Sequence, residues 1–296
     1  MVSVARSSLA TASIILAMVE LGRTVRFFLN GSGQGQPAAR HNGFSAWPAV
    51  RGLGRFTQLH VRCRGEIDPT TGYFININLI DQAVRHHVVP YLDQEVESTE
   101  AADVPMGTLM RTLVQLLQPA MNDSVQEVRL DLSPFCHMAI RSDPMNRVIV
   151  SQQYEFAAAH RLHVEALGED ENKRIFGKCN HASGHGHNYR VDVAVSAPID
   201  DHGRVVLVED LDAVVDSAVI ERFDHKNLNT DVPQFANLNP TVENIARVIY
   251  EILRDKVSEL GAELDSISVW ETSKTVCTYR GESASPQDPS MTSRAI

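Results

Sequence analysis

The chain has 296 residues, 43% of them hydrophobic and 22% charged, a globular composition with room for one large domain or two ordinary ones. The net charge of -10 argues against general nucleic-acid binding, because neutralising phosphates requires a basic surface. No apolar run reaches the roughly 18 to 20 residues that cross a bilayer. The four cysteines form no CxxC pair, which disfavours a disulfide framework or zinc ribbon and predicts a cytoplasmic location.

Residues 1–22 are expected to be a lead-in, poorly ordered or forming an amphipathic turn, with the fold beginning near Arg23. This stretch contains Arg6, a short apolar run and no acid until Glu20, so a cleaved targeting segment is the alternative. At the other end, residues 284–296 are expected to be a tail.

The chain repeats itself. Residues 70–94 match residues 201–225, which lie 131 positions later. The matched pairs are Gly72 with Gly203, Asp81 with Asp212, Val84 with Val215 and Asp93 with Asp224. Each copy reads as a turn glycine, a short β-rich run and an amphipathic helix.

The flanking segments correspond too. Each half is predicted to have two strands before this helix, then a second helix and a closing strand. These segments are 23–30, 56–65, 106–118 and 125–133 in the first half, and 147–160, 188–197, 239–253 and 264–273 in the second. We therefore expect an α+β fold of two ββααββ-like modules, residues 23–143 and 144–283, with the boundary near Pro144.

The stretch FGKCNHASGHGHNY, residues 176–189, indicates a metal site. His185 and His187 stand two residues apart at the start of a predicted strand, so their imidazoles share one face. An open catalytic zinc site of the three-histidine type needs one more ligand. His160, which ends the preceding predicted strand, is the best candidate, while His163 and His181 are nearer alternatives in loops.

Cys179 lies in the loop before these histidines. It is either a fourth metal ligand, which would close the site, or a free thiol acting as a base or nucleophile beside the metal. Spacing alone leaves both roles open.

Further polar residues follow. Asp224 and His225 are an adjacent acid and imidazole in a predicted turn, able to relay protons, whereas the first half has Gln94 at the position of His225.

Thr241 and Glu243 begin a predicted helix, where an N-cap and a first-turn acid are also structural signals. Glu271 is predicted in the middle of a strand, where a buried carboxylate needs a partner such as the paired N–H groups of a guanidine-like ring edge.

Together these motifs resemble the 6-pyruvoyltetrahydropterin synthase family, which has the tunnelling fold (T-fold). The resemblance covers residues 150–282 and rests on FAAAHRL, EDENKRIFGKCNHASGHGHNYRVDV, DHKNLN, NPTVENIA and VWETSKTVCTYRGE. It implies zinc ligands at His160, His185 and His187, a general base at Cys179 and proton transfer assisted by Asp224 and His225. It also implies a pterin anchor at Glu271, with Thr241 and Glu243 lining the same pocket.

The reaction that the resemblance implies is zinc-dependent elimination of triphosphate from 7,8-dihydroneopterin triphosphate, giving 6-pyruvoyltetrahydropterin. The 6-carboxytetrahydropterin synthase branch usually has three residues between the cysteine and HGH, whereas this chain has five, residues 180–184. That branch, and a non-catalytic pterin-binding or scaffold protein, are the alternatives.

The first half is expected to keep the fold without the chemistry. The 131-residue shift places Leu29 opposite His160 and Phe56 opposite His187, and no HxH occurs in residues 1–143. Family members resemble a dimer of trimers. A homo-oligomer is therefore expected, with three tandem chains presenting six modules as one form.

Overall fold

The structure is a computed structural model that describes residues 17–30, 42–98 and 104–281. Most of the expected lead-in and the expected tail, residues 1–16 and 284–296, lie outside these ranges. Among the described residues the first strand begins at Met18, five residues before the expected start at Arg23.

The two halves have the same order of main elements. The first half contains β1 (Met18–Leu29), β2 (Arg55–Glu66), a continuous helical stretch of α1 (Ile77–Ala83), η1 (Val84–Val88) and α2 (Val89–Glu97), then α3 (Met106–Leu117), η3 (Pro119–Met121), β3 (Val125–Asp131) and β4 (Cys136–Arg141). The second half contains β5 (Arg147–His160), α4 (Glu169–Phe176), η4 (Gly177–Asn180), β6 (His185–Pro198), α5 (Val208–Val215), η5 (Asp216–Ile220), α6 (Glu221–Phe223), β7 (Lys226–Asn227), α7 (Leu228–Asp231), η6 (Pro233–Phe235), α8 (Val242–Glu259), β8 (Glu263–Thr272) and β9 (Thr275–Tyr279).

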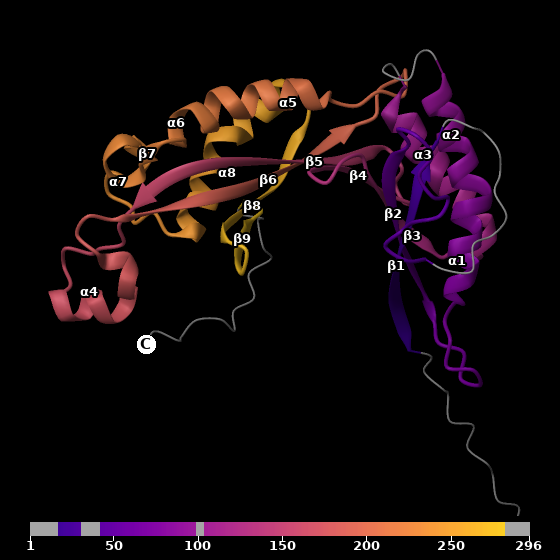
Figure 1. Ribbon diagram of the computed structural model, residues 1–296, viewed down its shortest axis with the longest axis horizontal. Helices are drawn as coiled ribbons and strands as arrows, with labels where there is room; N and C mark the ends of the chain where they lie inside the picture. Colours follow the sequence, from indigo (N-terminus) through magenta and orange to yellow (C-terminus); the bar gives the residue numbers. More distant parts are fainter. Residues whose placement is uncertain (1–16, 31–41, 99–103, 282–296) are drawn as a thin grey trace, which may run out of the picture.

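One antiparallel sheet runs through both halves in the order β1-β2-β3-β4-β5-β6-β8-β9, and β7 adds a short parallel pair to β5. The halves join where residues 136–139 of β4 pair with residues 149–152 of β5. The main helices of both halves cover the same face of this sheet, and no helix of the described residues lies on its other face (Figure 1). The fold is therefore α+β, as expected.

The core follows the two periodicities of the sequence. On β6, Tyr189, Val191 and Val193 are fully buried under the helices, while the intervening residues point to the helix-free face. On α8, buried apolar residues recur at three- and four-residue spacing and seal the sheet. No helix in the described ranges is long and apolar enough to cross a membrane.

Two details of the expected repeat were wrong. The short β-rich runs after Gly72 and Gly203 form no strand, although both glycines turn the chain with positive φ, 72° and 77°. Asp93 also lies inside α2, whereas Asp224 follows the end of α6. Good helix formers continue after Asp93, while His225 takes a φ of 57° that no helix accommodates.

Candidate metal centre and active site

Three histidines converge at the end of the β5–β6 hairpin. His160 is directly opposite His185 in the register, and His187 is two residues further along β6, so all three imidazoles lie on the helix-covered face. One nitrogen from each lies within 4.8 Å of the others, and the Nε2 atoms of His160 and His185 are 3.2 Å apart. The loop histidines, His163 and His181, are not in this group.

His160 is completely buried, and its Nδ1 lies 2.8 Å from the carbonyl oxygen of Pro240. A proton held at Nδ1 by this carbonyl leaves Nε2 as a lone pair directed at the other two rings. Burial lowers the pKa of both His160 and His187, which favours the neutral form that binds metal.

Nδ1 of His185 and Nε2 of His187 are buried without a hydrogen-bond partner. Unpartnered buried nitrogens are costly unless a ligand takes them up. The three-histidine donor set therefore fits a metal ion, and His160, His185 and His187 are the residues that could hold it.

Glu271 faces the same cluster. It lies one residue before the end of β8, and not in the middle of the strand as expected. Its Oε1 is 3.5 Å from Nε2 of His160 and 3.7 Å from Nε2 of His187. Its side chain is 20% exposed, so the carboxylate keeps one side open to a ligand.

Asp224 and His225 form an oriented pair against β5. The Asp224 carboxylate accepts the backbone N–H of Ala157 at 2.8 Å through Oδ1, and its Oδ2 lies 2.8 Å from Nδ1 of His225. The Ala157 N–H, followed by the bond to His225, lowers the pKa of Asp224. The His225 side chain is 84% exposed, which leaves the far edge of its ring free to meet a substrate.

An open cavity of about 790 Å³ joins these groups. It is lined by the β5 residues 157–159, by Gly186, His187 and Asn188 of β6, and by His225, Lys226, Asn227 and Glu271. The fold therefore brings His187, the Glu271 carboxylate and the exposed His225 imidazole to the lining of one cavity.

Cys179 lies in the 3-10 turn η4 and is half-buried. It is not part of the metal-competent group of the described residues, which makes a fourth-ligand role the weaker of the two alternatives. Burial, followed by the negative charge of Glu271, raises the pKa of the thiol.

Thr241 and Glu243 occupy the start of α8. The Thr241 hydroxyl accepts the Asn244 N–H at 3.4 Å as the N-cap, and Glu243 is exposed in the first turn. Neither residue lines the cavity described above. The link between Thr241 and the site is its neighbour in the sequence, Pro240, whose carbonyl oxygen contacts Nδ1 of His160.

Two residues around His160 were missed by the sequence reading. Tyr189 is fully buried, and its hydroxyl lies 3.3 Å from Nδ1 of His160. Its position two and four residues after His187 and His185 places it on the same face, a signal that was available in the sequence. Pro240 had no such signal, because a backbone carbonyl is present at every residue.

The corresponding place in the first half is built differently. On β5, Ala157 O accepts the N–H of His225 at 2.6 Å. Arg26 of β1 lies 131 positions before Ala157 and makes the corresponding two hydrogen bonds with Asn42 and Trp47. Its N–H donates to Asn42 Oδ1 at 3.1 Å, and its carbonyl accepts the Trp47 N–H at 3.0 Å.

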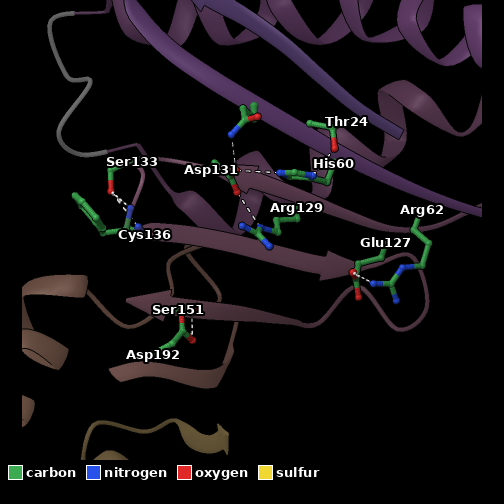
Figure 2. Close-up of polar contacts among 12 residues, drawn as sticks. Thr24, His60, Arg62, Glu127, Arg129, Asp131, Ser133, Cys136, Ser151 and Asp192 are labelled. Atoms are coloured by element: carbon green, nitrogen blue, oxygen red, sulfur yellow. Dashed lines mark hydrogen bonds and ion pairs between the residues drawn. The ribbon is translucent and has the colours of Figure 1, made fainter. Parts of the chain in front are cut away.

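The described part of the first half contains no group of metal-competent side chains. His60 is engaged instead on the helix-free face, where its Nε2 lies 2.9 Å from Asp131 and its Nδ1 lies 2.8 Å from the Thr24 hydroxyl (Figure 2). Asp131 is also bound by Arg129.

Fold and site together define a class, an α+β protein with a three-histidine metal centre at the end of a β-hairpin. The family model for 6-pyruvoyl tetrahydropterin synthase matches residues 149–282. The chain is 42% identical over 134 residues to the 6-pyruvoyl tetrahydrobiopterin synthase of Homo sapiens, covering 45% of this chain and 91% of that protein. It is 39% identical over 133 residues to that of Drosophila melanogaster, covering 45% and 79%.

Among solved structures, 6-pyruvoyl tetrahydropterin synthase of Caenorhabditis elegans is similar with 38% identity and a TM-score of 0.43, covering 46% of this chain and 96% of that one. On the strength of the sequence matches, the chain belongs to the 6-pyruvoyl tetrahydropterin synthase family.

Proposed function

We propose that this protein is a zinc-dependent pterin synthase that eliminates triphosphate from 7,8-dihydroneopterin triphosphate to give 6-pyruvoyltetrahydropterin. The observation that carries the proposal is the three-histidine cluster beside a cavity that also exposes His225 and Glu271. The match with this chain covers most of the length of the two relatives described above. The names of these relatives support the same reaction.

Zinc is the proposed ion, because three imidazoles with no fourth protein ligand in the described group are typical of an open catalytic zinc site. When bound, zinc would act as a Lewis acid that polarises the oxygens of the substrate side chain.

The proton transfers are assigned to this chain's own residues. We assign proton removal from the substrate carbon to Cys179, whose thiolate form a nearby cation would favour. We assign a second proton transfer to His225, an assignment supported by the Asp224 contact to its Nδ1 and by the exposure of its side chain.

Glu271 is the proposed anchor of the pterin ring. A carboxylate accepts two parallel N–H groups from a guanidine-like ring edge, and the side chain is only one-fifth exposed, which strengthens such bonds. Thr241 and Glu243 are proposed to line the same pocket. Thr241 also has a structural role as the N-cap of α8.

The experiment is to incubate the zinc-loaded protein with dihydroneopterin triphosphate and to follow triphosphate release and pterin products by mass spectrometry. We expect 6-pyruvoyltetrahydropterin. A 6-carboxytetrahydropterin product would move the protein to the other branch, and tight pterin binding with no turnover would indicate a non-catalytic binder.

Cys179→Ala tests the base. We expect a fall in turnover of at least about 100-fold, the usual contribution of a positioned acid or base, with unchanged zinc content. Cys277→Ala is the matched control, since Cys277 is equally half-buried but lies on β9. Near wild-type turnover of Cys179→Ala would remove Cys179 from this role.

We also propose that residues 23–143 are a T-fold module that has lost its site. The shared element order, the positive φ at Gly72 and Gly203, and a π-helical segment at the same place in each half, η1 and η5, support a duplication.

The cytoplasmic location expected from the cysteines remains part of the proposal, and all four are free thiols.

A further inference from the structure

The carbonyl of Pro240 orients the imidazole of His160, so whatever fixes this carbonyl also fixes one of the three metal-competent histidines. Its oxygen lies 2.8 Å from Nδ1 of His160, and both residues are buried. The contact joins residues 80 positions apart, so β5 alone does not set its geometry. The direction of the Pro240 carbonyl must come from the segment that leads into α8.

Pro240 is the middle residue of a tight turn. The N–H of Thr241 donates to the carbonyl oxygen of Asn239 at 2.8 Å, a bond over two residues that defines a γ-turn. A proline ring holds φ at about −65°, close to the value that the inverse γ-turn needs.

The planarity of the next peptide unit aims the carbonyl. The bond between Pro240 and Thr241 is trans, and in a planar trans unit the N–H and the C=O point in opposite directions. Because the N–H of this unit is bound to Asn239, its carbonyl is directed to the opposite side, where His160 lies.

Two asparagine side chains hold the turn in place. Nδ2 of Asn244, in the first turn of α8, donates to the carbonyl oxygen of Asn239 at 2.8 Å. Oδ1 of Asn239 accepts the backbone N–H of His163 at 3.0 Å. The turn is therefore tied on one side to α8 and on the other to the loop that follows β5.

These bonds close a circuit around His160. The chain runs from His160 to His163, whose N–H binds Asn239, and the next residue, Pro240, returns to His160 through its carbonyl. The two asparagines act with opposite polarity, since Asn244 uses an N–H donor and Asn239 uses an oxygen acceptor. A substitution that removes the donors but keeps the oxygens therefore distinguishes them.

The first half offers a comparison. Leu29 stands where the second half has His160, so no imidazole has to be oriented there. α3 begins after Pro105, whose ring offers no capping oxygen, and residues 104–117 contain no asparagine. Formation of a helix at this place does not require the asparagines, which occur in the half that carries the histidine cluster.

We propose that Asn239 and Asn244 are positioning residues of the metal centre, and that they act through the Pro240 carbonyl on the direction of the His160 lone pair. Neither asparagine belongs to the metal-competent group of the described residues. Removing an outer partner that orients a metal-binding histidine usually weakens metal affinity about 10- to 100-fold. The inference rests on the proposed metal ion at the three histidines and adds the residues that align one of them.

Asn→Asp substitutions test the proposal, because they keep the size of the side chain and an oxygen but remove the N–H donors. Asn244→Asp loses the bond to the Asn239 carbonyl, so we expect zinc affinity, measured by competition with a chromogenic chelator, to fall about 10- to 100-fold. Asn239→Asp keeps an oxygen for the His163 N–H and should bind zinc as the wild type does. Asn239→Ala loses this acceptor and should weaken zinc binding over the same range.

Neither helix stability nor charge accounts for the expected difference. Asn244 lies in the first turn of α8, where the helix dipole favours an acid, so Asn244→Asp should not weaken the helix. An added negative charge attracts Zn²⁺, which opposes the expected loss of affinity. Both Asp variants carry the same added charge.

The visible spectrum of the Co²⁺-substituted protein gives a second readout, because it reports the ligand geometry independently of turnover. We expect a changed spectrum in Asn244→Asp and in Asn239→Ala. The wild-type spectrum is expected in Asn239→Asp and in the control Asn237→Ala, which replaces an exposed asparagine of the same loop.

Two results would overturn this inference alone. One is wild-type zinc affinity and a wild-type Co²⁺ spectrum in Asn244→Asp, and the other is an equal loss of affinity in Asn239→Asp and Asn244→Asp. A wild-type protein that binds no zinc would overturn the proposed metal centre together with the inference.

Discussion

The residues of the metal centre differ in how strongly their surroundings fix them. His160 is completely buried and held by Pro240, whereas His185 and His187 rely on the pleat of β6 and leave buried nitrogens unpartnered. Glu271 completes the group as a carboxylate near two imidazoles. A substitution here can therefore change metal binding, substrate binding or both, and isosteric variants are needed to separate them.

Glu271→Gln keeps the size of the side chain and removes its charge. We expect KM for the pterin substrate to rise about 10-fold or more, because a hydrogen bond to a charged group contributes about 1.5–3 kcal/mol. Zinc content should remain that of the wild type. Glu263→Gln, at the far end of the same strand, is the control and should leave KM unchanged. Loss of zinc from Glu271→Gln would instead make Glu271 a part of the metal site.

Asp131 allows a test by pH in the first half. Burial opposes its ionisation, but the hydrogen bond from His60 and the charge of Arg129 outweigh burial, and the pKa of Asp131 is lowered. A lowered carboxyl pKa stabilises the fold above the unfolded value of about 4, and this contribution is lost as the pH falls through the folded value.

We therefore expect Asp131→Asn to reduce the free energy of unfolding by about 1–3 kcal/mol at pH 7. The difference from the wild type should shrink as the pH is lowered from 5 towards 3. Urea unfolding at several pH values measures it, and a difference that is constant over this range would contradict the assignment.

Among the elements, α8 connects the core to the site. Its apolar face packs on the sheet, and its N-terminus follows Pro240, the carbonyl partner of His160. The position of His160 thus depends on where this helix begins. Loss of the N-cap would act on stability first and on the metal centre through the Pro240 carbonyl.

Thr241→Ala should lower the free energy of unfolding by about 1 kcal/mol, the usual effect of losing a helix N-cap, and Thr241→Ser should restore most of it. Denaturant unfolding compares the three proteins. If Thr241 also lines the pterin pocket, Thr241→Ala will raise KM for the pterin substrate in addition to lowering the free energy of unfolding. Unchanged stability with a raised KM would assign Thr241 to the substrate alone.

At the scale of the whole molecule, one continuous sheet carries two halves with different chemistry. The single group of metal-competent side chains in the described residues lies in the second half. The first half contributes strands β1 to β4 and joins the second half through the pairing of β4 with β5.

We expect one zinc per chain, measured by metal analysis, and none in His160→Ala. Chelation should lower the melting temperature, since a ligand at 100 times its Kd stabilises the folded state by about 2.7 kcal/mol. His60→Ala, a substitution in the first half, should keep one zinc. Two zinc ions per chain would refute the loss of the site in residues 23–143.

Much of the site could be predicted from the sequence because its signals are local. Two histidines at a two-residue spacing share a strand face whatever lies around them, and an Asp–His pair is adjacent by covalent connection. The same period predicted the strands, and the three- and four-residue apolar spacing predicted α3 and α8. The family resemblance then supplied roles that spacing left open, such as that of Cys179.

Other features depended on the tertiary structure because they join residues distant in the chain. The carbonyl of Pro240 reaches His160 across 80 positions, and Asn42 holds the β1 edge at Arg26 where the second half uses Asp224. The alignment of Asp93 with Asp224 failed because each residue's position depends on where its helix ends. The joining of the two halves into one sheet through β4 and β5 likewise depends on strand order and register, which no local pattern of residues specifies.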